Sequence, residues 1–436
     1  MKTKTLGIFA HIDGEFVPAG KLDVAEEHAD VRASSFQYGS IYLSRKNAIE
    51  IDPVSLPMQG ALGRKLFPID GLTLPGGIRD AAPDGWGRRV IEARLHAQPN
   101  SLPESTYLLY AGDSRAGALD IRESISSKSP VPTYIKSHQL TYLLEAAGRI
   151  EAGETIPANL EDIFLAGTGS GGMRPKATVE DDGELWLAKF PSRNETMDIP
   201  LIEAATMHLA SLAGMNVPEI RVKRIGDHSV MMIKRFDRFN DDSGHCRRHM
   251  VSALTMLGCH ESESREKSYH DIAASIRRHS RAGDIKSGQS ELFARMIFNI
   301  MVTNDDDHLR NHAFLYTPGK GGGWGLSPLY DVMPRAAVSQ ERFLHLSIGK
   351  QGRLATLDNA LSGYAGFGLT LEEARSIIDR VWAITREWKV YFSEFGVPDK
   401  EIDKISSAFR HINEILSTKT GRDQQDIAVA PPAPGL

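Results

Sequence analysis

Cysteine is scarce in this chain of 436 residues, with only Cys246 and Cys259 present. Two cysteines cannot cross-link so long a chain extensively, which excludes a secreted fold built on disulfides. Long apolar runs are also missing, and none approaches the roughly 18 residues that a membrane-spanning helix needs. His11 and Asp13 interrupt the first apolar stretch, which is too short for a signal peptide. We therefore expect a soluble cytoplasmic protein.

Charge of one sign is not in excess either, because 51 basic residues face 56 acidic ones, a formal net charge of −5. Proteins that bind polyanions over much of their surface usually carry a basic excess, so this class is disfavoured, although a local basic face is compatible with the count. At about 100–200 residues per domain, the length predicts about two to four structural units.

The first 125 residues contain short strand patterns separated by turns. Alternating residues on both sides of Asp13-Gly14 predict a β-hairpin. Ser40–Leu43 and Ala48–Asp52 are two further strand candidates, and a helix is expected to begin after Asp84. The polar stretch 125–160 is expected to be a partly helical connector.

A second β-rich region follows the connector. Two strands, 176–180 and 184–190, are joined through Asp182-Gly183, which is a strong hairpin signal. A helix over 201–213 is closed by Gly214, and strands are expected at 219–223 and 230–234.

From about residue 250 the apolar spacing becomes helical. Examples are Leu292, Met296 and Ile300, the capping box of Thr370 with Glu373, and a last helix from Ile402 to Leu416. A β-rich unit followed by an all-helical unit predicts an α+β fold. The proline-rich end of the chain is expected to be a loose tail.

The sharpest chemical signal is the acidic segment Asn304–Asn311. Its three adjacent aspartates repel one another unless a cation or positive side chain compensates them, and oxygen ligands of this kind suit Mg²⁺ bound with phosphate. Asp306 and Asn311 have the Asp-x-x-x-x-Asn spacing of a kinase catalytic loop, and Asp331 follows in an apolar setting. The alternative is a solvated acidic loop with an N-cap for the next turn.

Two further signals precede this segment. Residues 167–176 are rich in glycine, which lets backbone N–H groups approach phosphate, but no Gly-Lys-Ser/Thr completes a Walker A loop. Lys189 ends an apolar strand, and its position permits a pair with Glu203 of the following helix. The alternatives are a flexible hairpin loop and a lysine that reaches water at the rim. Together, however, the signals occur in the order used by protein kinases, without the usual His-Arg-Asp and Asp-Phe-Gly sequences.

With these motifs the chain resembles the HipA family of toxin kinases from bacterial type II toxin–antitoxin modules. The segments that carry the resemblance are Asp80–Arg89, Gly171–Ala177, Lys234–Arg238, Asn304–Asn311 and Tyr330-Asp331, with Phe36–Tyr38 and Asp113–Leu119 in the N-terminal unit. The resemblance implies a protein-kinase-like fold, with a β-rich N-lobe and an all-helical C-lobe, and an extra β-rich N-terminal subdomain. The implied boundaries are 1–125 for that subdomain, 126–250 for the connector and N-lobe, 251–425 for the C-lobe and 426–436 for the tail.

The resemblance also implies roles for individual residues. Asp306 would be the catalytic base, with Asn311 and Asp331 as Mg²⁺ ligands. The implied nucleotide-binding residues are Gly171, Gly172, Met173, Arg174, Pro175 and Lys176 at the phosphates, Lys189 with Glu203, Lys234, Arg235 and Phe236 at the hinge beside adenine, and His308, Arg310 and Tyr330. The implied cofactors are ATP and Mg²⁺.

Family members often carry a serine in the glycine loop whose autophosphorylation silences the kinase. Here Gly169 stands at that position, so we predict that Ser170 or Thr168 substitutes for it. The resemblance further implies a DNA-binding HipB-like antitoxin, contact with operator DNA mainly through that antitoxin, and a protein substrate such as an aminoacyl-tRNA synthetase.

Other functions remain open at this point. A metal-dependent hydrolase would use Asp305–Asp307, His308 and Asp331 but would leave Lys189 and the glycine loop without a role. A non-catalytic co-repressor would act through its partner and DNA, with local basic patches at Arg247-Arg248 and Arg277–Arg281. A zinc site among the scattered histidines and cysteines near Cys246 and Cys259 lacks any Cys-x-x-Cys pair.

Overall fold

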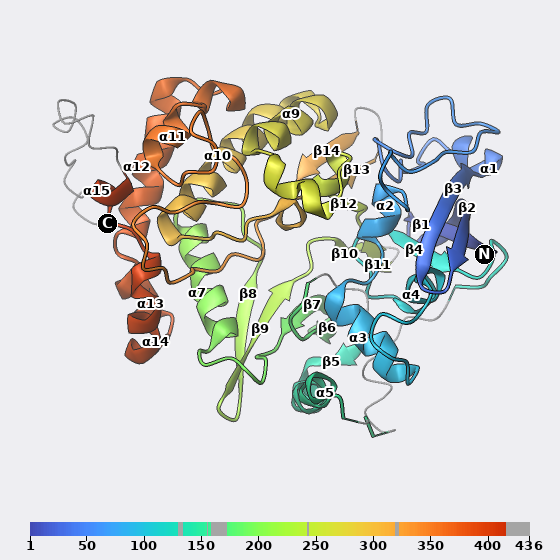
Figure 1. Cartoon of the computed structure of the whole chain (residues 1–436), viewed down its shortest axis with the longest axis horizontal. Helices are drawn as coiled ribbons and strands as arrows, with labels where there is room; N and C mark the ends of the chain where they lie inside the picture. Colours follow the sequence, from blue (N-terminus) through green and yellow to red (C-terminus); the bar gives the residue numbers. More distant parts are fainter. Residues whose placement is uncertain (130–133, 155, 158–171, 242–243, 319–321, 416–436) are drawn as a thin grey trace.

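The computed structural model describes residues 1–129, 134–154, 156–157, 172–241, 244–318 and 322–415. Within them the strands form four sheets. Figure 1 shows the N-terminal sheet in blue at the right, the sheet of the N-lobe below the centre and most of the later helices at the upper left. No helix among these residues is both long and apolar enough to cross a membrane.

The N-terminal sheet is antiparallel and has the strand order β3-β2-β1-β4. Its strands are β1 (Lys2–Ile12), β2 (Glu15–Glu27), β3 (Asp30–Tyr38) and β4 (Leu119–Arg122). The predicted hairpin at Asp13-Gly14 is confirmed, with Ile12 paired to Glu15 and positive φ at both turn residues. The helices of this part are α1 (Ser40–Leu43), α2 (Gly76–Asp80), α3 (Gly85–Arg94) and α4 (Glu104–Tyr110).

Two predicted strands in this region are wrong. Residues 40–43 form the short helix α1, which turns Tyr42 inward so that its hydroxyl donates to the Ile49 carbonyl at 2.8 Å. Residues 48–52 form none of the named strands. The Asp52 carboxylate accepts from the backbone N–H groups of Val54 and Ser55, and such local side-chain bonding competes with a strand ladder.

The N-lobe sheet has the order β5-β6-β7-β9-β8. Its strands are β5 (Ile135–Lys136), β6 (Lys176–Asp181), β7 (Glu184–Lys189), β8 (Ile220–Ile225) and β9 (His228–Lys234). The predicted hairpin at Asp182-Gly183 is confirmed by the pairing of Asp181 with Glu184. Helix α5 (Leu140–Ala152) lies in the predicted connector, and α7 (Ile199–Leu212) follows the sheet. Beyond them is the small hairpin of β10 (Arg238–Asp241) and β11 (Gly244–Arg247).

The C-terminal region is mainly helical. Its helices are α8 (Ala253–Met256), α9 (Tyr269–His279), α10 (Ile285–Val302), α11 (Leu357–Leu361), α12 (Leu371–Thr385), α13 (Trp388–Glu394), α14 (Asp399–Ile405) and α15 (Ile412–Ile415). The predicted capping box is present at the start of α12, where the Thr370 hydroxyl accepts from the Glu373 N–H and the Glu373 carboxylate accepts from the Thr370 N–H.

Two expectations for this region need correction. It is not all-helical, because β12 (Met250–Ser252), β13 (Ala313–Thr317) and β14 (Gly323–Leu326) form a small antiparallel sheet. The expected last helix is also broken between α14 and α15. Arg410 turns inward there, and its guanidinium donates to the carbonyls of Ala355 and Gln340, so tertiary contacts override the helical spacing.

Three apolar cores hold these parts together. One lies under the N-terminal sheet, one lies in the N-lobe, and the largest joins α7 to the C-terminal helices. Helix α3 belongs to the first 125 residues, yet its Trp86 and Val90 are buried in the core of the N-lobe. The N-terminal part is therefore anchored in the N-lobe through α3.

Candidate functional site

The acidic segment follows directly after α10. Thr303 ends that helix in the left-handed conformation, with φ of +52°, and turns the chain into the loop. The main-chain oxygen of Asp306 accepts from the N–H of His308 at 2.8 Å and from Nδ2 of Asn311 at 3.1 Å. Asn311 therefore closes the loop on itself, while the Asp306 side chain stays 63% exposed. The Asp-x-x-x-x-Asn spacing here produces a compact loop with one largely exposed carboxylate.

The three adjacent aspartates lie in different surroundings. Asp305 is 3.2 Å from Nε of Arg335, whereas Asp306 is 3.8 Å from the same guanidinium. Asp307 is buried and accepts from the Tyr269 hydroxyl at 2.6 Å and from Nε2 of His312 at 2.8 Å. Burial alone would raise the pKa of Asp307, but these two partners hold it below its ordinary value. Protein groups therefore relieve much of the expected repulsion, and Asp306 is the carboxylate left open for chemistry.

Lys189 joins the N-lobe to the C-terminal region. Its ammonium donates to Oε1 of Glu203 on α7 at 2.6 Å and to Oδ1 of Asp331 at 2.8 Å. The pair with Glu203 that the sequence suggested is thus confirmed. Burial alone would lower the pKa of Lys189, but Asp331 and Glu203 reverse this and raise it above its ordinary value. Lys189 in turn holds the pKa of Asp331 below its ordinary value, against the effect of partial burial. Burial raises the pKa of Glu203, and the Lys189 ammonium opposes this shift. The three groups form a charged cluster centred on Lys189.

The end of the glycine-rich segment lies beside this cluster. Gly172 has φ of +102°, and a side chain at this position would collide with Nζ of Lys176. Burial lowers the pKa of Lys176, as does the nearby Lys189. Met173 is exposed, Arg174 pairs with Glu195 at 3.1 Å, and the Pro175 carbonyl accepts from the Phe190 N–H. The sites predicted at Gly171, Ser170 and Thr168 lie outside the described residues, as does Gly169.

The predicted hinge contains one half-buried and one buried cation. Lys234 is 3.4 Å from Glu184 at the lobe surface. Arg235 is buried and donates to Asp237 and to main-chain oxygens of residues 114 and 115, so its side chain has a structural role. The Phe236 ring lies 5.7 Å from that of Tyr330, between centroids. These two rings connect the hinge with the chain segment that carries Asp331.

His308 and Arg310 lie on the Asn304–Asn311 loop, and they differ in their contacts. The His308 ring is 5.8 Å from that of His345, and its buried Nδ1 has no hydrogen-bond partner among the described residues. Arg310 donates to Glu261 at 2.5 Å and to Asp80 at 3.4 Å. The Tyr330 hydroxyl donates to the Arg310 carbonyl at 2.6 Å. Arg310 is thus engaged by protein carboxylates.

A divalent cation fits the donors at this site. Asn311 uses its amide nitrogen to close the loop, which leaves its amide oxygen for a ligand, and Asp331 is a half-exposed carboxylate. Among the described residues no three His, Cys, Asp or Glu side chains form a metal group of their own. Two protein oxygens completed by phosphate and water oxygens are the coordination that Mg²⁺ commonly adopts beside a nucleotide.

Several further residues contact the site, and no local sequence pattern indicates their role. Asp80, Asp84 and Trp86 come from the N-terminal part, and Arg335 comes from the segment after Asp331. The first three lie in a motif that signalled family resemblance without indicating a role. Only the folded chain brings them to the site, because the Asp80–Arg310 contact spans 230 positions.

Two models of known protein domains match the chain. The model of the HipA-like C-terminal domain matches residues 168–388, slightly more than half of the chain, and that of the HipA N-terminal domain matches residues 15–122. A Sinorhizobium fredii protein named "Putative kinase Y4mE" is 24% identical over 383 residues, which cover 80% of this chain and 84% of that protein. The serine/threonine-protein kinase toxin HipA of Shewanella oneidensis is 28% identical over 145 residues, covering 30% of this chain and 33% of that protein.

A solved structure shares the overall fold. A chain from the Shewanella oneidensis complex of HipA, HipB and operator DNA matches with a TM-score of 0.65 at 17% identity, covering 94% of this chain and 96% of that chain. The likeness confirms the kinase-like fold predicted from the sequence. Given the two family-model matches and this shared fold, the chain belongs to the HipA family.

Proposed function

We propose that the chain is a serine/threonine protein kinase that transfers the γ-phosphate of ATP to a protein. The observation that carries the proposal is the cluster of Lys189, Glu203 and Asp331. The loop that carries Asp306 is joined to the segment of Asp331 by the hydrogen bond from the Tyr330 hydroxyl to the Arg310 carbonyl. The cluster and Asp306 are the set of charges that kinases use to hold nucleotide phosphates and to receive a proton from the target hydroxyl. The hydrolase alternative is less well supported, because Asp305 and Asp307 are engaged by Arg335, Tyr269 and His312.

Each group has a distinct task in the proposed transfer. Lys189, held in place by Glu203, neutralises phosphate charge, and Asn311 and Asp331 would hold Mg²⁺, which supplies further neutralisation when bound. The Asp306 carboxylate orients the hydroxyl of the target and accepts its proton. Because Asp306 is exposed while its loop is closed by Asn311, it can meet an external protein without rearrangement of the loop.

The proposed biological role rests on the family to which the chain belongs. We infer that the kinase is the toxin of a type II toxin–antitoxin module, that a HipB-like antitoxin restrains it, and that operator DNA is contacted mainly through the antitoxin. The solved Shewanella oneidensis complex, which contains HipA, HipB and operator DNA, supports this partnership. The proposed target is a component of translation such as an aminoacyl-tRNA synthetase, whose phosphorylation would arrest growth.

The proposal is tested by transfer of label from γ-labelled ATP to proteins of a cell extract. Wild-type protein is expected to label a discrete band, and Asp306→Ala is expected to abolish the labelling. Asp305→Ala is the matched control, since it removes the same charge one residue away and should retain most of the activity. Equal labelling by Asp306→Ala and wild type, or release of phosphate from phosphoesters without ATP, would overturn the proposal.

A further inference from the structure

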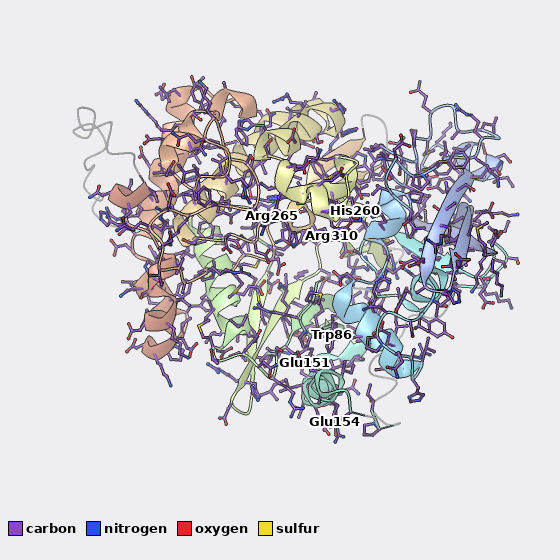
Figure 2. The ribbon with its side chains drawn as sticks, in the orientation of Figure 1. Trp86, Glu151, Glu154, His260, Arg265 and Arg310 are labelled. Carbon is purple, nitrogen blue, oxygen red and sulfur yellow. The ribbon has the colours of Figure 1, made fainter. Side chains whose placement is uncertain are left out.

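A short segment of the N-terminal part touches both sides of the proposed nucleotide site. It runs from Asp80, the last residue of α2, to Trp86 in the first turn of α3. We call it the 80–86 segment. Figure 2 shows its surroundings, with Trp86 on α3 and Arg310 on the C-terminal part of the chain. The segment belongs to the Asp80–Arg89 motif that carries part of the family resemblance. The proposed phosphoryl transfer gives it no role.

At its first end the segment holds the catalytic loop. The Asp80 side chain is only 5% exposed, and it accepts from the Ser252 N–H at 2.6 Å and from the Ser252 hydroxyl at 2.8 Å. Its carboxylate also pairs with Arg310 at 3.4 Å. Arg310 also pairs with Glu261, and Glu261 in turn pairs with Arg79 of α2 at 2.6 Å. The loop that carries Asp306 is thus tied to α2.

The charges in this contact are strongly coupled. Burial would raise the pKa of Glu261, but Arg310 and Arg79 lower it to about 2. Glu261 therefore stays ionised at neutral pH, as one anion shared by a cation of α2 and a cation of the catalytic loop.

At its other end the segment holds the end of the glycine-rich loop. The Asp84 carboxylate accepts from the Gly172 N–H, the Trp86 N–H donates to the Gly172 carbonyl at 3.0 Å, and the Trp86 indole donates to the Lys176 carbonyl at 2.9 Å. Trp86 is buried. Burial raises the pKa of Asp84, although Lys176 and the Gly172 N–H oppose the shift. Three hydrogen bonds therefore fix residues 172–176 relative to α3.

Attachment of the N-terminal part does not depend on these contacts alone. A separate buried network joins the turn around Gly117 to the hinge, where Asp237 accepts from the Gly117 N–H and Arg238 donates to the Gly117 carbonyl. Trp86 and Val90 add apolar anchoring in the N-lobe. Removal of one carboxylate from the segment should therefore leave the parts assembled while it releases one side of the site.

We propose that the 80–86 segment is a strut that sets the spacing between Gly172–Lys176 and the catalytic loop. Asp80 and Asp84 are its positioning residues: Asp84 fixes the phosphate-binding backbone, and Asp80 fixes Arg310 and with it the orientation of Asp306. This inference rests on the proposed kinase function. It adds that the N-terminal part completes the nucleotide site, because the kinase-like lobes alone lack both carboxylates.

The test separates nucleotide binding from transfer. For the full-length protein, calorimetric titration with MgATP gives the Kd, and initial rates of labelling in cell extract give the apparent kcat. Asp84→Ala is expected to weaken MgATP binding about five- to tenfold, as loss of a hydrogen bond to a buried N–H implies, with a smaller effect on kcat. Asp84→Asn keeps an acceptor for the Gly172 N–H and should restore most of the binding.

Asp80→Ala is expected to lower the labelling rate about tenfold through misplacement of the base, with Kd within about twofold of wild type. Asp80→Asn keeps one acceptor for Ser252 but loses the charge that pairs with Arg310, and it should lower the labelling rate less than Asp80→Ala does. Asp23→Ala is the control, since Asp23 pairs with Lys65 within the N-terminal part. If an alanine variant does not fold, the leucine variant at the same position, which removes the carboxylate but fills its volume, is measured in its place and should show the same split.

Wild-type values of Kd and kcat in folded Asp80→Ala and in folded Asp84→Ala would overturn the strut and would leave the kinase proposal intact. Equal losses of MgATP binding and of labelling rate in Asp80→Ala and Asp84→Ala would also overturn the strut, because equal losses would indicate general damage to the site. If the wild type transfers no phosphate, the kinase proposal fails, whereas an unchanged MgATP Kd in Asp84→Ala still refutes the strut independently.

Discussion

Lys189→Met would be the most revealing single substitution in the charged cluster. Lys189 lies 2.6 Å from Glu203 and 2.8 Å from Asp331, and the side chains of Lys189 and Glu203 are 9% and 2% exposed. Methionine keeps most of the side-chain volume but removes the ammonium. Glu203 would then be a buried carboxylate without its cation, whereas Asp331 is half-exposed and can regain water.

The expected loss of folding stability follows from the different burial of Glu203 and Asp331. Removing one partner of a buried ion pair typically destabilises a protein by about 3–5 kcal/mol, because the remaining charge is uncompensated. A double variant, Lys189→Met with Glu203→Gln, removes both charges and should recover a large part of this loss. Loss of the pair with half-exposed Asp331 should add no more than about 1 kcal/mol.

Urea unfolding of the wild type, the two single variants and the double variant measures these differences as a double-mutant cycle. We expect a coupling free energy of at least about 2 kcal/mol between Lys189 and Glu203. All variants that lack Lys189 should also fail to transfer phosphate, so restored stability would not restore activity. Additive effects on stability, or an active double variant, would refute the assignment of Lys189 as a phosphate-binding group held by Glu203.

Three further predictions follow from the same account. Expression of the wild type should arrest growth, and Asp306→Ala should relieve the arrest; undiminished toxicity of that variant, present at equal abundance, would count against the toxin role. Asp307→Asn should destabilise the fold by about 2–4 kcal/mol at pH 7, and urea midpoints should show the difference shrinking below about pH 4. The reason is that a carboxyl whose folded pKa is depressed contributes its full stabilisation above its unfolded pKa of about 3.9 and loses it as the pH falls through the folded pKa. A stability difference that does not change with pH would refute this account of Asp307. Incubation with ATP followed by fragment mass analysis should find phosphate on Ser170 or Thr168, and an unmodified 167–172 segment would refute self-phosphorylation there.

Local signals allowed much of the fold to be predicted. Turn residues at Asp13-Gly14 and Asp182-Gly183 specify both hairpins because their backbone conformations are rarely available to other residues. The spacing from Lys189 to Glu203 permits the pair that the structure shows but does not by itself require it. The capping box before α12 is as direct a signal as the two turns. Such features depend on a few neighbouring residues, and the rest of the structure does not compete with them.

Other features depend on distant parts of the chain. Residues 40–43 have strand-forming side chains, but the Tyr42 hydroxyl finds its acceptor at Ile49 and a helical turn results. The last helix breaks because Arg410 is drawn inward. In the candidate site, the opposing contacts of Asp80 and Asp84 appear only when chain segments 88 and 230 positions apart meet, so no local pattern could reveal them.

The most direct test of the central claim is to measure MgATP binding and phosphate transfer with purified Asp306→Asn. Asp306 is exposed and touches neither Lys189 nor Glu203 in the described contacts, so the variant should fold and bind MgATP within about twofold of the wild-type Kd. As the proposed base it should lose transfer by at least about a hundredfold. Wild-type transfer by this variant would contradict the account, as would loss of MgATP binding in a folded variant.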